Sequence, residues 1–303
     1  MKIITYNDLP LQNGCVLAIG VFDGVHVGHA SLLAMAKKEA EAENVPLVVF
    51  TFEETPKNEY SKHISSSSEK TLLLEKFGAD MVYFASFGAC RDMTPEIFTN
   101  DVLVGLFRVK CVVCGYDFRF GANRSGDAAC LTALLEKKGR NTVVVPPVYV
   151  GDEIVSSTLI RRCVSDGDME KASRLLGYGY SFTLPVEEGN HIGRTMGFPT
   201  VNQRFPDYRL APSFGVYACE CTFDGITMQG VADIGVKPTV TDKNEVICES
   251  HLFGSVGELY GKVVKTVLFK KLRSERKFSS LSELREAIAA DTDAAKRYFA
   301  NKK

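Results

Sequence analysis

The segment that most constrains this chain lies at residues 20–29 and reads Gly-Val-Phe-Asp-Gly-Val-His-Val-Gly-His. It follows an apolar run typical of a buried strand and precedes a pattern that predicts an amphipathic helix from Ala30. A strand, a glycine-rich turn and a helix together present backbone N–H groups and the positive helix end to a phosphate. His26 and His29 share one face of this helix start, so both imidazoles can donate hydrogen bonds to one ligand. The segment predicts a nucleotide site rather than an ordinary turn with surface histidines.

The segment resembles the HxGH signature of the nucleotidyltransferase superfamily, whose members transfer a nucleotidyl group from ATP or CTP. That resemblance implies a partner element further along the chain, and residues 156–161, Ser-Ser-Thr-Leu-Ile-Arg, have the required character. Hydroxyl groups at a helix start most often cap its free N–H groups. Here Arg161 follows Thr158 by three residues, and its planar guanidinium suits the oxygens of a polyphosphate.

Length and charge exclude several classes of protein. A chain of 303 residues is long for one core, which predicts two domains. The net charge of −1 and the pI near 6.5 argue against a protein that binds nucleic acid or a membrane surface electrostatically. No apolar run approaches bilayer length, and residues 1–8 lack a signal-peptide layout. We therefore expect a cytoplasmic protein.

The nine cysteines are scattered along the chain, which is typical of a reducing compartment. Cys111 and Cys114 form the only CxxC, but they lie in an apolar, strand-like run without a second pair at zinc spacing. Cys219 and Cys221 would share one face of a strand. We expect no structural zinc.

Short apolar runs alternate with helical patterns in the first half of the chain. Strands are predicted at 16–19, 47–52, 81–84, 111–114 and 143–145, and helices at 30–43, 68–77, 95–107 and 128–138. This alternation predicts a parallel α/β sheet with ligands at the carboxyl ends of its strands. Gly177 or Gly179 is expected to end the last helix of this domain.

The second half is rich in strands. They are predicted at 216–223, 228–234, 246–252 and 263–269, with no helix between them. Successive short strands of this kind predict an antiparallel barrel or sandwich. Two helices are expected to close the chain, one at 281–290 capped by Ser279 or Ser280 and one at 292–300.

Three segments of the first half resemble the signatures of the prokaryotic FAD synthetase family, whose N-terminal module is an FMN adenylyltransferase. They are residues 22–29, 115–121 and 156–161. The resemblance implies that the FMN phosphate attacks the α-phosphorus of ATP, while His26 and His29 stabilise the charge that grows on phosphate oxygens. It implies ATP contacts for Gly20, Phe22, Asp23, Gly24, His26, Gly28, His29, Ser156, Ser157, Thr158 and Arg161, and flavin contacts for Asp117 and Phe118.

A second candidate site opens the strand-rich half. Thr200 and Asn202 alternate along an extended segment, so their oxygens emerge on one side, and two neutral oxygen ligands suit Mg²⁺ on a nucleotide. The alternative is an ordinary Asn/Thr turn. Glu249 lies within an apolar strand and must face either solvent or a polar cleft.

These residues resemble the riboflavin kinase module of the same family. Residues 199–202 match its PTxN signature, and 259–261 and 272–278 match its later segments. The resemblance implies that Glu249 is the general base for the riboflavin 5′-hydroxyl and that Thr200 and Asn202 hold Mg²⁺. It also implies nucleotide or flavin contacts for Gly193, Arg194, Gly197, Phe198, Pro199, Thr200, Asn202 and Arg273. The chain has no Walker A sequence, so this kinase would not use a P-loop.

The chain departs from the family pattern in two places. Thr55 precedes Pro56 where family members often have a His-Pro pair, which weakens a flavin or phosphate role for that loop. Gly254 and Glu258 stand where Asp is typical, which puts flavin closure in the kinase in question.

The resemblance covers nearly the whole chain and implies a bifunctional enzyme that makes FMN from riboflavin and FAD from FMN, with ATP and Mg²⁺. The expected fold is a Rossmann-like adenylyltransferase domain, 1–178, and a six-stranded Greek-key riboflavin kinase barrel with C-terminal helices, 179–303. We expect small-molecule partners only, and a monomer or weak homo-oligomer. Two alternatives remain: a nucleotidyltransferase for another acceptor with a non-catalytic barrel, and a flavin-sensing or nucleic-acid-binding regulator without turnover.

Overall fold

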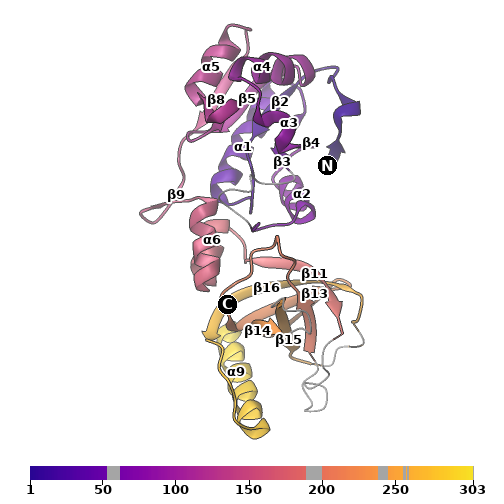
Figure 1. Cartoon of the computed structure of the whole chain (residues 1–303), viewed down its shortest axis with the longest axis vertical. Coiled ribbons are helices and arrows are strands. Elements are labelled where there is room, and N and C mark those ends of the chain that lie inside the picture. Colours follow the sequence, from indigo (N-terminus) through magenta and orange to yellow (C-terminus); the bar gives the residue numbers. More distant parts are fainter. Residues whose placement is uncertain (53–61, 189–199, 238–244, 255–256, 258, 303) are drawn as a thin grey trace. The chain divides into compact units, whose positions relative to one another are not determined.

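The computed structural model describes residues 1–52, 62–188, 200–237, 245–254, 257 and 259–302. The chain forms two compact units, Met1–Ser157 and Thr158–Lys303 (Figure 1). The functional boundary after residue 178 stays a prediction.

The first unit contains a six-stranded parallel sheet in the order β1-β4-β3-β2-β5-β8. Its strands are β1 (Lys2–Ile4), β2 (Cys15–Ile19), β3 (Leu47–Phe52), β4 (Met81–Ala85), β5 (Val109–Gly115) and β8 (Asn141–Val145). Two short pairs lie outside the sheet: β6 (Arg119–Phe120) with β7 (Gly126–Asp127), and β9 (Tyr149–Val150) with β10 (Glu153–Ile154). The predicted parallel α/β sheet is confirmed.

Helices cover both faces of this sheet. The helices of this unit are η1 (Tyr6–Asp8), α1 (Val27–Ala42), α2 (Ser67–Lys76), α3 (Phe87–Arg91), α4 (Pro95–Ile97), η2 (Phe98–Leu106), η3 (Ala122–Arg124) and α5 (Ala128–Glu136). Alternate residues of β2 pack in two separate cores: Val16 lies with Leu33 of α1, whereas Leu17 lies with Leu103 of η2 and Leu131 of α5. Each of these leucines is fully buried, which contributes about 1.5–3 kcal/mol per side chain.

The helix predicted at 95–107 changes type along its length. Thr94 caps α4 and Pro95 occupies its first position, which fits the fixed φ of proline. From Phe98 the segment continues as a π-helix, so that the Phe107 N–H donates to the Val102 carbonyl five residues earlier at 3.0 Å.

The cysteines of the CxxC lie on opposite faces of the sheet. Cys111 packs in the core that contains α1, and Cys114 in the core that contains α5, because successive side chains of a strand alternate. The two thiols therefore cannot bind one metal ion. All nine cysteines fall within the described residues, and none forms a disulfide.

The second unit contains a closed antiparallel barrel in the order β11-β12-β15-β14-β13-β16. Its elements are α6 (Ser157–Asp166), α7 (Met169–Leu176), β11 (Ser181–Glu187), β12 (Thr200–Arg204), β13 (Gly215–Phe223), β14 (Ile226–Lys237), β15 (Glu245–Leu252), β16 (Val263–Arg273) and α9 (Leu281–Asn301). The neighbours β16-β13-β14-β15 have the Greek-key order. Gly177, with φ of 80°, ends α7.

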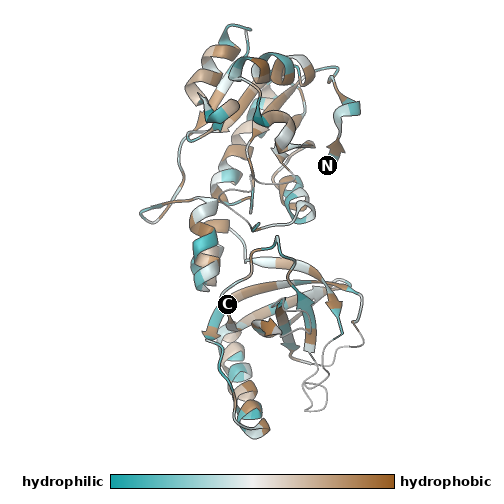
Figure 2. Ribbon diagram, viewed as in Figure 1, coloured by the Kyte–Doolittle hydropathy of each residue, from teal (hydrophilic) through white to brown (hydrophobic). Residues whose placement is uncertain are grey.

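The expectation of two C-terminal helices is wrong, because α9 runs without a break from Leu281 to Asn301. The two predicted ranges leave out Asp291, whose carboxylate binds the Arg273 guanidinium of β16 and does not compete for the helix backbone. Ser280 is the cap: its hydroxyl accepts from the Glu283 N–H. Figure 2 shows both hydrophobic and hydrophilic residues along α9, as expected for a helix with one buried face.

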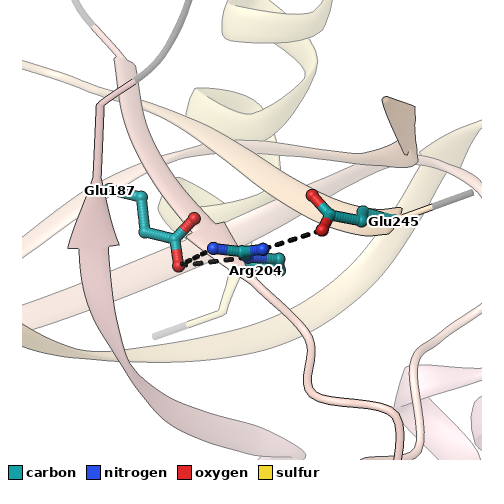
Figure 3. A network of polar contacts seen from close by, with 3 residues as sticks. All are labelled: Glu187, Arg204 and Glu245. Atoms are coloured by element: carbon teal, nitrogen blue, oxygen red, sulfur yellow. Dashed lines mark hydrogen bonds and ion pairs between the residues drawn. The ribbon is translucent and has the colours of Figure 1, made fainter. Parts of the chain in front are cut away.

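Strand alternation divides the polar residues of β12 between the two sides of the barrel wall. Gln203 is fully buried; its amide donates to the Leu184 and Val264 carbonyls at 3.0 and 2.7 Å and accepts from the Thr266 hydroxyl at 2.6 Å. The next residue, Arg204, is exposed. Figure 3 shows its guanidinium between Glu187 and Glu245, at 2.8 and 2.7 Å.

Candidate functional sites in the two units

The order of the strands indicates where a ligand would bind to the first sheet. From β2 the chain adds β3 and β4 on one side and then returns to add β5 on the other. Ligands of open α/β sheets bind where the order reverses, at the carboxyl ends of the strands. The segment after β2 and the segment after β5 both begin at this point.

The turn after β2 has a strained backbone that Asp23 holds in place. Phe22 and Gly24 have φ values of 51° and 77°, a region that a residue such as phenylalanine rarely adopts. The buried Asp23 carboxylate accepts from the N–H groups of Ile64 and Ser65 at 3.0 and 3.1 Å, and the Gly24 N–H donates to the Ser65 hydroxyl at 3.1 Å. A Cβ at Gly24 would lie 2.8 Å from Ile64. The Asp23 carboxylate thus fixes the turn by binding backbone.

The two histidines are stacked at the start of α1. Their ring centroids are 3.6 Å apart and their planes differ by 17°. His26 is the N-cap, and its Nδ1 accepts from the His29 N–H at 3.3 Å. Because Nδ1 accepts, the proton of a neutral His26 is on Nε2, which is then a donor. A Cβ at Gly28 would lie 3.1 Å from the His26 ring, so glycine leaves room for this arrangement.

His29 is uncharged at neutral pH. Burial lowers the pKa of His29 well below 6.5, and the nearby His26 and Lys70 lower it further. Its Nδ1 is buried and has no hydrogen-bond partner among the described residues. A buried polar atom without a partner is costly. The ring is therefore poised to bond a group that the protein itself does not supply.

The turn also contacts Ser157, the first residue of α6. The Ser157 hydroxyl donates to the Asp23 carbonyl at 2.9 Å, which joins two of the predicted ATP-binding residues within the first unit. Ser156 directly precedes the helix. Thr158 and Arg161 follow on α6, in the second unit, and their predicted phosphate contacts stay predictions.

The predicted flavin residues follow β5. The Phe118 N–H closes a turn on the Gly115 carbonyl at 3.1 Å. Asp117 is exposed, and a Cβ at Gly115 would lie 3.0 Å from its carboxylate. The Phe118 ring stacks on Phe120 with centroids 5.4 Å apart. One charged and one aromatic side chain thus follow the carboxyl end of β5.

Two residues that support the turn were missed by sequence reasoning. The buried Thr51 hydroxyl donates to the Val21 carbonyl at 2.8 Å. The buried Lys70 ammonium donates to the same carbonyl and to that of Phe52. The Ser66–Glu69 capping box marks the start of α2 in the sequence, but no local signal shows that Lys70 is buried.

In the second unit, the register gathers polar side chains on the outer face of the barrel wall. Asn202 lies opposite Glu249, and Glu249 lies opposite Asp233 on the next strand. Directly opposite side chains have Cβ atoms about 4.5–5.5 Å apart. Thr200 shares this face, and the Asn202 amide donates to its hydroxyl at 3.4 Å. Two neutral oxygens and two carboxylates thus lie on three adjacent strands.

Arg273 joins this region to α9. Its guanidinium makes a bidentate contact with Asp291, with Nε–Oδ1 and Nη2–Oδ2 distances of 3.0 and 2.8 Å. Asp291 is nearly buried. Partial burial raises the pKa of Asp233, which Arg273 opposes and Glu275 and Asp291 reinforce. Asp233 and Asp291 were not predicted, since a single acidic residue has no distinctive sequence pattern.

Several predicted residues lie outside the described part of the chain: Gly193, Arg194, Gly197, Phe198, Pro199, the Thr55–Pro56 pair and Glu258. Gly254 is described and has a φ of 133°. Across the described residues, no group of three or more His, Cys, Asp or Glu side chains is placed to hold a metal ion. In the same residues, no helix has both the length and the apolar character needed to cross a membrane.

Two family profiles match the chain. The FAD synthetase profile matches residues 8–159, and the riboflavin kinase profile matches residues 176–299. A bifunctional riboflavin kinase/FMN adenylyltransferase from Escherichia coli K12 is 36% identical over 295 residues, covering 95% of this chain and 94% of that protein. The protein of the same name from Bacillus subtilis 168 is 34% identical, covering 96% and 94%.

One solved structure has a closely similar fold. It is titled as a macrolide-efflux protein from Streptococcus pneumoniae, with a TM-score of 0.88 and 28% identity. The match covers 98% of this chain and 99% of that one. The likeness extends over both units, whereas function has to be derived from the sites.

Proposed function

This chain belongs to the bifunctional riboflavin kinase/FMN adenylyltransferase family, and from that premise we propose which residues carry out each reaction. It phosphorylates riboflavin to FMN and adenylylates FMN to FAD, both from ATP. The FAD synthetase region is N-terminal and the riboflavin kinase region is C-terminal. We assign adenylyl transfer to residues 1–178 and phosphorylation to residues 179–303.

The first reaction needs no protein nucleophile. An oxygen of the FMN phosphate attacks the α-phosphorus of ATP, the bond to the bridging oxygen breaks, and pyrophosphate leaves. The enzyme has to position the two phosphates and stabilise the growing negative charge. His26 Nε2–H and the N–H groups at the start of α1 are the donors we assign to this task. Losing one such donor typically costs about 10²–10³ in rate.

The stacked imidazoles are the observation that carries this assignment. A neutral His29, whose buried Nδ1 has no hydrogen-bond partner among the described residues, follows the strand at which the sheet order reverses. Gly20, Phe22, Gly24 and Gly28 shape the turn around it, and Asp23 holds the turn rather than contacting phosphate with its carboxylate. We keep Ser156, Ser157, Thr158 and Arg161 as ATP residues, and Asp117 and Phe118 as flavin residues.

The second reaction needs a base. The riboflavin 5′-hydroxyl oxygen attacks the γ-phosphorus of ATP, ADP leaves, and Glu249 accepts the hydroxyl proton, a contribution of about 10²–10⁴ in rate. The neighbouring Thr200 and Asn202 oxygens fit Mg²⁺, which prefers oxygen ligands and retains water. When bound there, Mg²⁺ would neutralise charge on the ATP phosphates. Gly193, Arg194, Gly197, Phe198, Pro199 and Arg273 remain our candidates for nucleotide or flavin contacts.

We further propose that the enzyme works in the cytoplasm as a monomer or weak homo-oligomer with small-molecule partners only. The absence of disulfides among its nine cysteines supports a reducing compartment. Its near-neutral charge argues against nucleic acid or a membrane surface as a partner.

Separate substitutions test the two sites. Chromatography would follow FMN and FAD in reactions started from riboflavin or from FMN. We expect His29→Ala to abolish FAD formation and leave FMN formation intact, and Glu249→Gln to do the reverse. Loss of both products in either variant would contradict the two-site assignment. FMN binding without turnover by the wild-type protein would favour the sensor alternative.

A further inference from the structure

Lys70 of α2 is a buried lysine beneath the turn that follows β2. Only 2% of its surface is exposed. Its Nζ donates to the Val21 carbonyl at 3.0 Å and to the Phe52 carbonyl at 3.1 Å. Val21 belongs to the turn after β2 and Phe52 is the last residue of β3. The ammonium therefore joins the carboxyl ends of two adjacent parallel strands.

A buried ammonium is costly unless it is paired. Among the described residues, no carboxylate lies within ion-pair distance of Lys70. The Asp23 carboxylate favours the charged form from a distance, but it is bonded to the Ile64 and Ser65 N–H groups. Two carbonyl oxygens compensate only part of the cost, so an anion bound at the turn would find a positive charge that the described residues leave incompletely neutralised.

We propose that Lys70 is a positioning residue for adenylyl transfer: it fixes the turn between β2 and α1 from below and places a buried positive charge behind the ATP phosphates. This inference rests on the proposed function of that turn. One of the two carbonyl contacts of Lys70 is to Val21, which precedes Phe22 and Asp23 in the strained segment. The charge acts through a protein interior, where it is screened less than in water.

The rate of FAD formation is therefore expected to depend on the charge of Lys70. Burial lowers the pKa of Lys70 to about 8, against the opposing effect of Asp23. The charged or titratable groups that face it are Asp23 from the turn and His29 from α1. On its own helix, Glu69 is bonded to the Ser66 N–H. The pKa of His29 lies well below 6.5, so between pH 7 and pH 9 Lys70 is the member of this group that changes charge.

Two substitutions separate charge from shape. Lys70→Met keeps an unbranched side chain, one atom shorter, and removes the charge, whereas Lys70→Arg keeps the charge to higher pH. Lys76→Met, at an exposed position of the same helix, is the matched control. The measurements are kcat and KM for FAD formation from FMN and ATP between pH 6 and pH 10, with FMN formation from riboflavin followed in the same preparations.

At pH 7 we expect Lys70→Met to lower kcat/KM for ATP in FAD formation at least 10-fold, with FMN formation and Lys76→Met unchanged within twofold. In the wild-type enzyme FAD formation should fall as the pH rises through about 8, since the buried ammonium loses its proton there. The decline should be absent in Lys70→Met and should move to higher pH in Lys70→Arg.

A wild-type rate and pH profile in Lys70→Met would overturn the proposal. If Lys70→Met does not fold, the comparison of wild type with Lys70→Arg decides, and an unmoved decline overturns the proposal. His29→Ala separates this failure from failure of the proposed function: FAD formation lost in His29→Ala and kept in Lys70→Met refutes only the role of Lys70. FAD formation kept in both variants refutes the site itself.

Discussion

Replacing Gly28 by alanine should separate the stability of the first unit from its activity. Gly28 is the second residue of α1, where alanine favours the helix over glycine by up to about 1 kcal/mol. The new Cβ would lie 3.1 Å from both Cε1 and Nδ1 of His26. This ring is already stacked on His29 with centroids 3.6 Å apart. It can therefore relieve the contact only by moving a few tenths of an ångström out of its place.

The expected cost falls on adenylyl transfer. A displacement of about 1 Å at a catalytic group can cost about 10²-fold in rate, so a shift of a few tenths should cost about 10-fold. We expect Gly28→Ala to form FAD from FMN about 10-fold more slowly, to form FMN from riboflavin at the wild-type rate, and to unfold at the same or a slightly higher temperature.

Gly88→Ala is the matched control, because Gly88 is likewise the second residue of its helix, α3. A Cβ there would meet only the Ser86 hydroxyl, at 3.8 Å. We expect both activities of this control to be unchanged. Undiminished FAD formation in Gly28→Ala would refute the view that the His26 ring has to stand where it does. Equal losses of FAD and FMN formation would show that the substitution acts through general misfolding.

Three further outcomes follow from single contacts. Asp291→Ala should destabilise the second unit by roughly 3 kcal/mol because it leaves the Arg273 guanidinium without its partner; thermal unfolding would measure this, with FMN formation slowed and FAD formation from FMN retained. Gln203→Leu should lower the free energy of unfolding by about 1–3 kcal/mol for each carbonyl left unpaired. Arg204→Ala, in the exposed network of Figure 3, should lower it by less than about 1 kcal/mol. Urea titration of both variants would measure the difference. Because the folded-state pKa of His29 is depressed, the unfolding free energy should decrease as the pH falls below 6.5, by at most about 1.4 kcal/mol per pH unit; a wild-type slope in His29→Asn would contradict this origin.

The sequence was most informative where one local pattern determines the structure. The runs that became β3 and β5 are largely apolar because both faces of a central parallel strand are buried. β11 was missed although Phe182, Leu184 and Val186 alternate with exposed residues, because Pro185 interrupts the pattern. Pro185 is accommodated at the end of the pairing with β16, opposite Val263.

The C-terminal helix shows how a long-range contact can override a local signal. An aspartate in mid-helix can compete with the backbone for hydrogen bonds, and Asp291 lies between the two helices predicted at 281–290 and 292–300. In the folded chain the Asp291 carboxylate binds a guanidinium from a strand 18 residues earlier, which removes that competition. No local sequence pattern indicates this pairing. Arg273 lies in a segment that matches the family, and it was therefore predicted to contact the nucleotide or flavin.

For the adenylyl transfer site, the sequence identifies the chemical groups but not their protonation states. His26 and His29 were recognised as donors from their spacing, and an exposed pair would titrate near pH 6.5. Burial lowers the pKa of His29, and the nearby His26 and Lys70 lower it further, so His29 supplies no positive charge at this turn. Lys70 of α2 brings a buried ammonium to the turn across the end of β3. In the sequence it is only a helical lysine next to Glu69. The electrostatics of the site depend on which side chains the fold excludes from water, and this can be determined only from the three-dimensional structure.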